Sequence, residues 1–210
     1  MKLYSTVLKE ASAEQIIEKS KFIAYVKPVS TKEEAENFIS YVKKKHRDAT
    51  HNVPAMVLGD KFQVQWASDD GEPQGTSGAP IVQMLVSQGI TNVVIVVTRY
   101  FGGIKLGTGG LVRAYTSSAK LGLTAAELCN VEEMTLLTYG IDYTYLSKMQ
   151  NLSAAGMFEI AETQYEDKVK ITLLCLPEKR DEVMKTVANL TGGKDILEME
   201  EKKCVKRKLE

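Results

Sequence analysis

Residues 68–115 read SDDGEPQGTSGAPIVQMLVSQGITNVVIVVTRYFGGIKLGTGGLVRAY, and they decide how the rest of the chain is interpreted. This stretch contains nine of the 15 glycines. Glycine tolerates positive φ and lacks a Cβ, so such a density indicates unusual turns or a closely approached backbone. Residues 93–98 are apolar and mostly β-branched, which suits a buried strand. The stretch predicts an acidic loop, a helix, a buried strand, a glycine-rich loop and a second helix, with both loops on the same side of a sheet.

The flanking sequence predicts further strands and helices for an N-terminal domain of residues 1–132. Ser30 and Glu33 have the spacing of a capping box, and apolar residues then recur at helical spacing. Pro80 suits the first turn of a helix capped by Thr76 or Ser77. The expected strands are Tyr4–Leu8, Phe22–Val29, Val53–Leu58 and Phe62–Ala67, and the expected helices include Thr31–Lys45 and Leu111–Leu128.

Residues 133–210 follow a different pattern and predict a second domain. Strands, helices and turn residues alternate there in the order βαββαβ, which is that of a ferredoxin-like sheet. The charged segment Lys202–Glu210 is expected to be a solvated tail. The predicted fold class is therefore α+β with two domains. The expected elements are Met134–Asp142, Leu146–Ala155, Met157–Glu166, Lys168–Leu176, Glu178–Leu190 and Ile196–Val205.

Composition excludes several classes of protein. The 27 basic and 27 acidic residues cancel, so any nucleic-acid binding must use a local patch instead of a globally basic surface. No apolar run approaches the ~20 residues that span a bilayer, and residues 1–10 do not resemble a signal peptide. We therefore expect a cytoplasmic protein without a membrane partner. Cys129, Cys175 and Cys204 are widely spaced and fit reduced thiols better than disulfides or a zinc site.

The glycine-rich loop predicts an anion or nucleic-acid site. It precedes a helix, where unpaired amides and the positive end of the helix dipole favour anions. It lacks the spacing of a dinucleotide fingerprint and of a P-loop, which argues against a nucleoside-triphosphate enzyme. An alternative is that the glycines only allow tight packing. Tyr100 and Phe101 could stack on bases, or one of them could cap the core. The expected anion-binding residues are Arg99, Tyr100, Lys105, Gly107, Thr108, Gly109, Gly110 and Arg113.

The acidic loop offers Asp69, Asp70 and Glu72, and His51 either lines the same cleft or is a hydrogen-bonded structural residue. These acids lack the spacing of a calcium loop, so we expect no metal. They form either a solvated turn or ion pairs with Arg99 or Arg113 that hold the two loops in register. Residues 75–79 read GTSGA and lack the final glycine of a nucleophile elbow. No catalytic residue and no cofactor is predicted.

Several of these motifs together resemble the IMPACT family in its bacterial, YigZ-like form. They are SDDGEPQGTSGAP at 68–80, IVVTRYFGGIKLGTGGLVRAY at 95–115, SKF at 20–22 and THN at 50–52. The resemblance implies an N-terminal domain like that shared by a small-subunit ribosomal protein and domain IV of elongation factor G. It also implies a C-terminal domain like domain V of that factor. Such kinship is an associational argument for a link to translation.

Three functional hypotheses follow. The first is a non-catalytic protein that binds RNA or the ribosome and is linked to regulation of translation. The second is an enzyme acting on a phosphorylated small molecule, with His51 and the acidic loop beside the anion site. The third is a protein–protein regulator, as the resemblance implies for eukaryotic relatives, which use an additional N-terminal domain not expected in this chain. The sequence does not indicate an oligomeric state.

Overall fold

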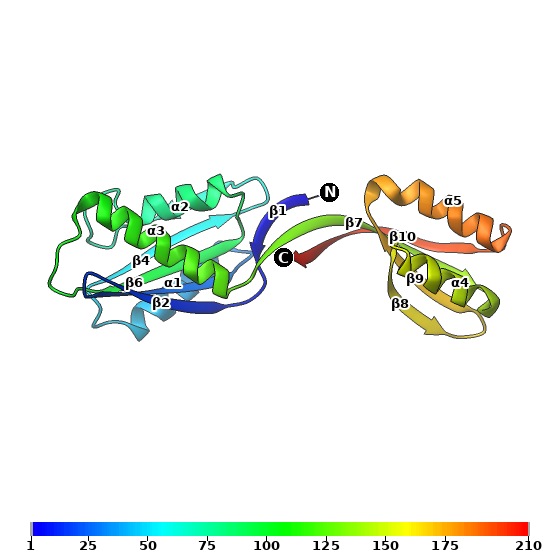
Figure 1. Cartoon of the computed structure of the whole chain (residues 1–210), viewed down its shortest axis with the longest axis horizontal. Coiled ribbons are helices and arrows are strands. Elements are labelled where there is room, and N and C mark those ends of the chain that lie inside the picture. The colour runs from blue at the N-terminus through cyan, green and yellow to red at the C-terminus, as the bar shows by residue number, and fades with distance from the viewer. Residues whose placement is uncertain (1, 210) are drawn as a thin grey trace. The chain divides into compact units, whose positions relative to one another are not determined.

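The computed structural model describes residues 2–209, which form two compact units with mixed α+β structure. The N-terminal unit comprises Leu3–Val131 together with the chain from Lys206 onward. The C-terminal unit comprises Glu132–Val205. The prediction of an α+β chain with two domains is confirmed (Figure 1). Within residues 2–209, no helix is both long enough and apolar enough to cross a membrane.

The N-terminal unit is built on a five-stranded antiparallel sheet in the order β2-β3-β6-β4-β5. The central strand is the predicted buried run, and it extends two residues further, to Tyr100. Placing this apolar strand between two neighbours satisfies its backbone groups on both sides. The bounds of the five strands are β2 Ala11–Ile17, β3 Ser20–Pro28, β4 His51–Leu58, β5 Val64–Ala67 and β6 Val93–Tyr100.

Three helices cover the two faces of this sheet: α1 (Lys32–Lys45), α2 (Gly78–Ser87) and α3 (Gly107–Ala125). Side chains alternate along β6, so that Val93, Ile95 and Val97 pack with α2 and α3. Val94 and Val96 pack with α1 on the other face. Figure 1 shows α2 and α3 side by side. The same alternation decides on which face each side chain at the end of β6 lies.

An edge strand and a helix cap in this unit differ from the predictions. The edge strand β2 was not expected, because its sequence ASAEQII has short polar residues and little apolar alternation. The helix α1 is capped by Thr31 instead of Ser30. The Thr31 hydroxyl accepts from the Glu34 amide at 3.2 Å, and the Glu34 carboxylate accepts from the Ser30 amide at 2.7 Å. The first half of the predicted capping box is thus present one residue later, and its returning bond reaches the residue before the N-cap.

The C-terminal unit has the predicted βαββαβ order. Strand β9 lies between β7 and β8, and β10 pairs with β7, which gives the ferredoxin-like arrangement. Side chains of both helices pack on one face of the sheet around Leu137, Ile171 and Leu173. The elements are β7 Leu128–Ile141, α4 Tyr143–Ala154, β8 Glu159–Tyr165, β9 Val169–Cys175, a short 3-10 helix Pro177–Lys179, α5 Arg180–Thr191 and β10 Ile196–Lys208.

The last residues of the chain differ from the expected solvated tail. Strand β10 continues to Lys208, and Lys208 forms an ion pair with Glu127 at 2.8 Å. The Leu209 amide donates to the Leu128 carbonyl at 3.1 Å. Strand β1 (Lys2–Val7) is hydrogen-bonded to β7 in the same sheet. The charged sequence was misleading because a strand that is exposed along most of its length does not need apolar side chains.

Candidate functional site

The acidic loop and the end of β6 meet through a buried ion pair between Glu72 and Arg99. Arg99 Nη1 donates to Glu72 Oε1 at 2.7 Å, and the two side chains are 4% and 5% exposed. The Tyr115 hydroxyl of α3 donates to the same oxygen at 2.8 Å. Burial and the Glu72 charge raise the pKa of Tyr115 well above its usual value, so this phenol keeps its proton. One of the two expected pairings, that with Arg99, is therefore present.

This pairing removes Arg99 from the expected anion-binding residues. Its guanidinium carbon lies 5.4 Å from the ring centres of both Phe22 and Phe101. Its Nη2 donates to Ser20 Oγ at 3.3 Å, and its Nε is buried without a partner among the described residues. An external phosphate would have to displace Glu72 to reach this charge. Arg99 therefore holds the acidic loop instead of facing solvent.

His51 and Asp70 attach the acidic loop to β4 and α1. His51 Nδ1 donates to the Asp70 carbonyl at 2.8 Å, and His51 Nε2 lies 3.8 Å from Glu72 Oε2. The Asp70 carboxylate accepts from the Asn52 amide and from Lys43 Nζ, each at 2.6 Å. His51, Asp70 and Glu72 thus form internal hydrogen bonds and ion pairs, which agrees with the expected alternative of an internally paired loop.

Ser77 occupies the N-cap position of α2, as expected, but the side chain that accepts from the start of the helix is that of Asp69. Its Oδ1 accepts from the amides of Ser77 and Gly78 at 3.1 and 3.0 Å and from the Ser77 hydroxyl at 2.6 Å. Desolvation alone would raise the pKa of Asp69, but the hydrogen bonds from Ser77, Gly75 and Gly78 outweigh it and lower the pKa below its usual 3.8. Asp69 is thus ionised and structural at neutral pH.

Tyr100 lies on the opposite face of the sheet from Arg99, because neighbouring residues of a strand point to opposite sides. Its hydroxyl bonds His46 Nδ1 at 2.8 Å and donates to Asp48 at 3.3 Å, while Tyr25 bonds His46 Nε2 at 2.7 Å. Burial, followed by the charge of Lys45, lowers the pKa of His46, which favours the neutral ring. Tyr100 is thus part of a polar cluster beside α1, and the predicted site did not include His46.

The expected glycine-rich loop is partly helical, because α3 begins at Gly107 and not at Leu111. Gly103 and Gly107 have φ of +86° and +68°, which favour glycine. A Cβ on Gly102 would lie 2.0 Å from the Lys19 carbonyl carbon, so the turn between β2 and β3 can pack here only against glycine. Three of these glycines are therefore explained by the fold itself. Gly109 is not among them.

The first turn of α3 presents unpaired amides to solvent. Its N-cap, Leu106, makes no side-chain hydrogen bond, and the turn contains no acidic residue. Thr108 and Gly109 are exposed there, as are Lys105 before the helix and Arg113 in its second turn. The Arg113 Nη1 lies 3.6 Å from the position of a Cβ on Gly109. The structure thus groups Lys105, Arg113 and the residues of the first turn, but it excludes Arg99 and Tyr100 from this group.

A pocket of about 430 Å³ adjoins this first turn and includes Lys105, Gly110 and Arg113 in its lining. Glu18 also lines it, from the turn between β2 and β3. No sequence pattern singles out Glu18, because a Glu-Lys pair lacks the Asn-Gly signal of a tight hairpin turn. We call this cavity the α3 pocket.

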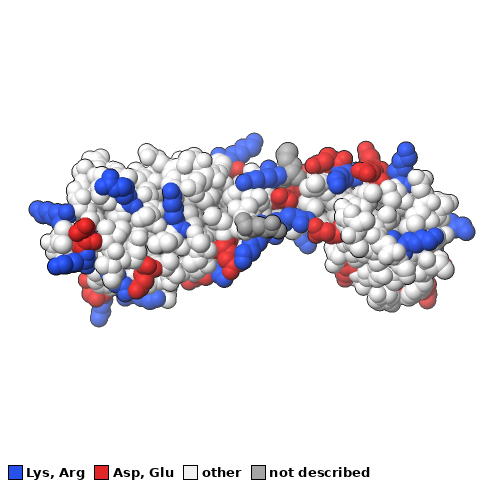
Figure 2. All heavy atoms as spheres, in the orientation of Figure 1, with Lys and Arg blue, Asp and Glu red and all other residues white. Residues whose placement is uncertain are grey.

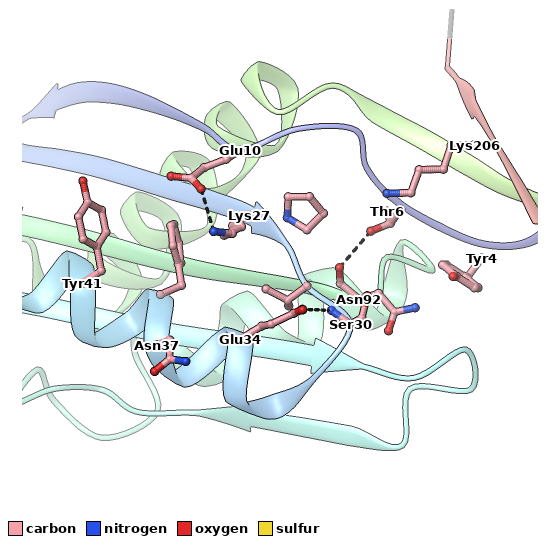
Figure 3. A pocket seen from close by; sticks show the side chains of 13 residues that line it. Tyr4, Thr6, Glu10, Lys27, Ser30, Glu34, Asn37, Tyr41, Asn92 and Lys206 are labelled. Atoms are coloured by element: carbon pink, nitrogen blue, oxygen red, sulfur yellow. Dashed lines mark hydrogen bonds and ion pairs between the residues drawn. The ribbon is translucent and has the colours of Figure 1, made fainter.

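A larger pocket of about 730 Å³ lies between α1, β1 and β3, and we call it the α1 pocket (Figure 3). Its charged groups are largely engaged with one another. Lys27 lies 3.2 Å from Glu10, and Glu34 accepts from the Ser30 amide at 2.7 Å. Lys206 Nζ reaches the Val7 carbonyl at 3.4 Å. Despite its size, this pocket offers little uncompensated charge to a ligand.

Charged side chains of both signs are mixed on the surface, so any site for an anion would be a small cluster of cations. On the face shown in Figure 2, lysines and arginines are interspersed with acidic side chains over each unit. The totals are also equal, with 27 basic and 27 acidic residues in the chain. An anionic partner would therefore recognise a small group of cations, such as Lys105 and Arg113, instead of a broad basic face.

Comparison with known proteins places both units in named domain families. Residues 18–123 match the Impact N-terminal domain, and residues 140–194 match a domain of unknown function, DUF1949. IMPACT family member YvyE of Bacillus subtilis is 40% identical over 198 residues, covering 94% of this chain and 91% of that protein. IMPACT family member YigZ of Escherichia coli is 33% identical, covering 84% and 88%.

A solved structure gives the same result over nearly the whole chain. A crystal structure described as that of a hypothetical protein is 30% identical and covers 92% of this chain and 95% of its own. The TM-score of this pair is 0.57. With two domain matches in the expected order and relatives of similar length, the chain belongs to the IMPACT family.

Proposed function

We propose that this protein binds RNA, either within the ribosome or as a separate structured RNA, in a role linked to regulation of translation. The link to translation rests on the resemblance of the family's domains to those of a ribosomal protein and elongation factor G, which is an argument by analogy. The proposed contact surface comprises Lys105, the first turn of α3 and Arg113.

Gly109 is the observation that carries this proposal. Its φ is not positive, and a Cβ placed on it would meet only the flexible end of Arg113, at 3.6 Å. Glycine in a helix is less stable than alanine by roughly 0.5–1 kcal/mol, and here no contact within the described chain requires it. Because Gly109 has no side chain, the backbone of another molecule can approach the exposed first turn of α3 closely.

The electrostatics of the same surface favour a phosphate. The amides at the start of α3 lack a side-chain cap, and the helix dipole adds partial positive charge there. Neither Lys105 nor Arg113 has an ion-pair partner among residues 2–209. Two unpaired cations beside unpaired amides can contact phosphates of a nucleic acid backbone.

The enzyme hypothesis receives less support from the geometry. It requires His51, Asp69, Asp70 and Glu72 to face a substrate, but these groups make the internal contacts described above. Asp69 caps a helix, and Glu72 neutralises Arg99. A binding role therefore agrees better with the arrangement than acid–base catalysis does.

The test is RNA binding measured against salt concentration. We would compare wild type with the double variant Lys105→Gln, Arg113→Gln, using a structured ribosomal RNA fragment as the probe. The slope of log K against log salt should fall by about 0.7–0.9 for each phosphate contact that is lost. Lys185→Gln on α5 removes an exposed charge from the other unit and serves as the matched control. An unchanged slope in the double variant would reject the proposed surface.

A further inference from the structure

The α3 pocket has both apolar walls and charged groups from three separate parts of the N-terminal unit. Its volume of about 430 Å³ lies within the range of ligand sites in proteins, roughly 300–1,000 Å³. The turn between β2 and β3, the segment after β6 and helix α3 all contribute to it. The lining includes apolar Ile17, Ile104 and Leu106, and charged Glu18, Lys105 and Arg113.

The three charged groups in this pocket do not pair with one another. No ion pair within 4.0 Å joins Glu18 to Lys105 or Arg113, and none of the three pairs with another residue of the described chain. The pocket therefore offers a carboxylate and two cations at separate positions around one space. A complementary ligand would carry a negative group and, at some distance from it, N–H donors.

Glu18 is held in place by the local backbone. Glu18 and Lys19 have φ of +46° and +63°, the left-handed conformation that a tight hairpin turn requires at both central positions. Asn-Gly would adopt this turn with less strain. The turn is also packed against Gly102, where a Cβ would lie 2.0 Å from the Lys19 carbonyl carbon. The turn thus positions the side chain at residue 18 against the wall of the pocket.

We propose that the α3 pocket binds a guanine nucleotide, with the base between the apolar walls and its phosphate at Lys105 and Arg113. An ionised carboxylate only accepts hydrogen bonds, and guanine presents two adjacent donors, N1–H and the 2-amino group, on one edge. Glu18 would accept from both. Uracil presents a single N–H between two carbonyl oxygens, which a carboxylate repels, and cytosine and adenine present one amino group on that edge.

This inference rests on the proposed RNA binding, because it takes the bound guanine nucleotide to be part of an RNA. The same chemistry is offered by a free guanosine monophosphate and by a guanosine residue of an unpaired RNA strand. The experiment therefore uses two kinds of probe. One is a set of short single-stranded RNAs with G, A, C or U at one position in a constant uridine background. The other is the free monophosphates GMP and UMP.

The decisive variant is Glu18→Asn. Asparagine suits the left-handed backbone better than glutamate, so this change removes the carboxylate without endangering the turn. A thermal melt checks that the variant folds. Glu14→Gln removes a carboxylate from the adjoining strand β2, at a position that pairs with Lys21 and does not line the pocket, and it serves as the matched control.

We expect wild type to bind the G-containing RNA about 5- to 100-fold more tightly than the others, the discrimination typical of a bidentate base contact. Glu18→Asn should lose this preference and keep the salt slope of wild type, whereas Glu14→Gln should keep both. Binding of GMP over UMP that Glu18→Asn abolishes would support the pocket with a free nucleotide as its ligand.

The outcomes separate this inference from the proposed function. Salt-dependent RNA binding with equal affinity for all four bases would overturn the guanine pocket and leave RNA binding intact. A guanine preference that persists in Glu18→Asn would overturn the assignment to Glu18. If no RNA binds, the proposed function fails, and the pocket then stands only if GMP binds in a Glu18-dependent way. Absence of both kinds of binding overturns both proposals.

Discussion

The N-terminal unit contains two groups of charged residues that differ in one physical respect. Around Glu72, the charged and polar groups are buried or half-buried and have partners in the chain: Arg99 and Tyr115 donate to it, and His51 lies 3.8 Å away. Around the α3 pocket, Glu18, Lys105 and Arg113 are exposed and make no ion pair among the described residues. Both groups lie in the same unit, yet the first is engaged within the chain and the second leaves its charges exposed to solvent.

Burial explains the difference. A charge removed from water is destabilising unless it is paired and hydrogen-bonded, so the interior forces the acids and Arg99 to satisfy one another. Exposed charges remain hydrated and need no partner in the chain, which leaves them available to a ligand. Residues 68–115 therefore contain both buried, paired charges and exposed ones that make no ion pair within residues 2–209. Glu72 and Arg99 hold the acidic loop, whereas Lys105 and Arg113 face solvent.

The largest effect should come from breaking the buried pair. Glu72→Gln leaves the Arg99 guanidinium buried without a counter-charge, and such changes typically cost about 3–5 kcal/mol of unfolding free energy. Chemical denaturation measures this directly. The double variant Glu72→Gln, Arg99→Met removes both charges and should be less destabilised than the sum of the single changes. A loss below 1 kcal/mol for Glu72→Gln would mean that the pair is not structural, and the comparison would fail.

Parts of this contrast could be predicted from the sequence. The apolar run of β6 identified the central strand, and the proximity of the acidic loop to Arg99 was among the expectations. The alternation of β6 predicts that Arg99 and Tyr100 lie on opposite faces, but both residues were assigned to one site because they are neighbours in a motif. Neighbours in a strand point to opposite faces, so closeness in sequence does not place two side chains in one site.

Other features could not be predicted from local signals. Helix α3 begins at Gly107 although glycine disfavours helices, because packing of the later turns on the sheet outweighs local propensity. Glu18 enters the pocket only because the turn between β2 and β3 packs on Gly102, 84 residues further along the chain. Such contacts depend on tertiary structure, and no pattern near Glu18 indicates them.

The second-largest effect should come from a glycine on the buried side of α3. A Cβ on Gly122 would lie 2.7 Å from Val26 Cγ2 and 3.0 Å from the Ala24 Cβ, so Gly122→Ala forces α3 away from β3. Overpacking of this kind costs roughly 1–3 kcal/mol. Thermal or denaturant unfolding should show the loss. A neutral result would show that α3 can shift without cost, and the distinction between structural and functional glycines would be weakened.

An intermediate effect is expected at Asp69, which belongs to the internally bonded group. Asp69→Asn at pH 7 should cost about 0.5–2 kcal/mol, as loss of a helix cap typically does. Because the folded pKa lies below the usual 3.8, the stabilisation is present above that pH and is lost as pH falls through the folded pKa. The difference between wild type and Asp69→Asn should therefore shrink below about pH 4. A difference that does not depend on pH would assign the effect to packing instead of charge.

On the outward side, Gly109→Ala should change stability in the opposite direction from Gly122→Ala. Alanine has room there and should raise the unfolding free energy by about 0.5–1 kcal/mol. The same change should weaken RNA binding, because a methyl group then covers the first turn of α3. Melting and binding are measured on the same preparation. A variant that is more stable and binds as well as wild type would show that close backbone approach is not needed at this position.

The smallest effect on folding should come from the cations of the α3 pocket. Lys105→Gln together with Arg113→Gln should change the unfolding free energy by no more than about 0.5 kcal/mol, because neither side chain has an ion-pair partner among residues 2–209. Denaturant unfolding at low salt is the most sensitive measurement, since screening is weakest there. A loss of 2 kcal/mol or more would mean that these cations interact within the chain after all. Lys105 and Arg113 would then stabilise the fold, as the Glu72 cluster does. Their charges could no longer be assigned to a ligand.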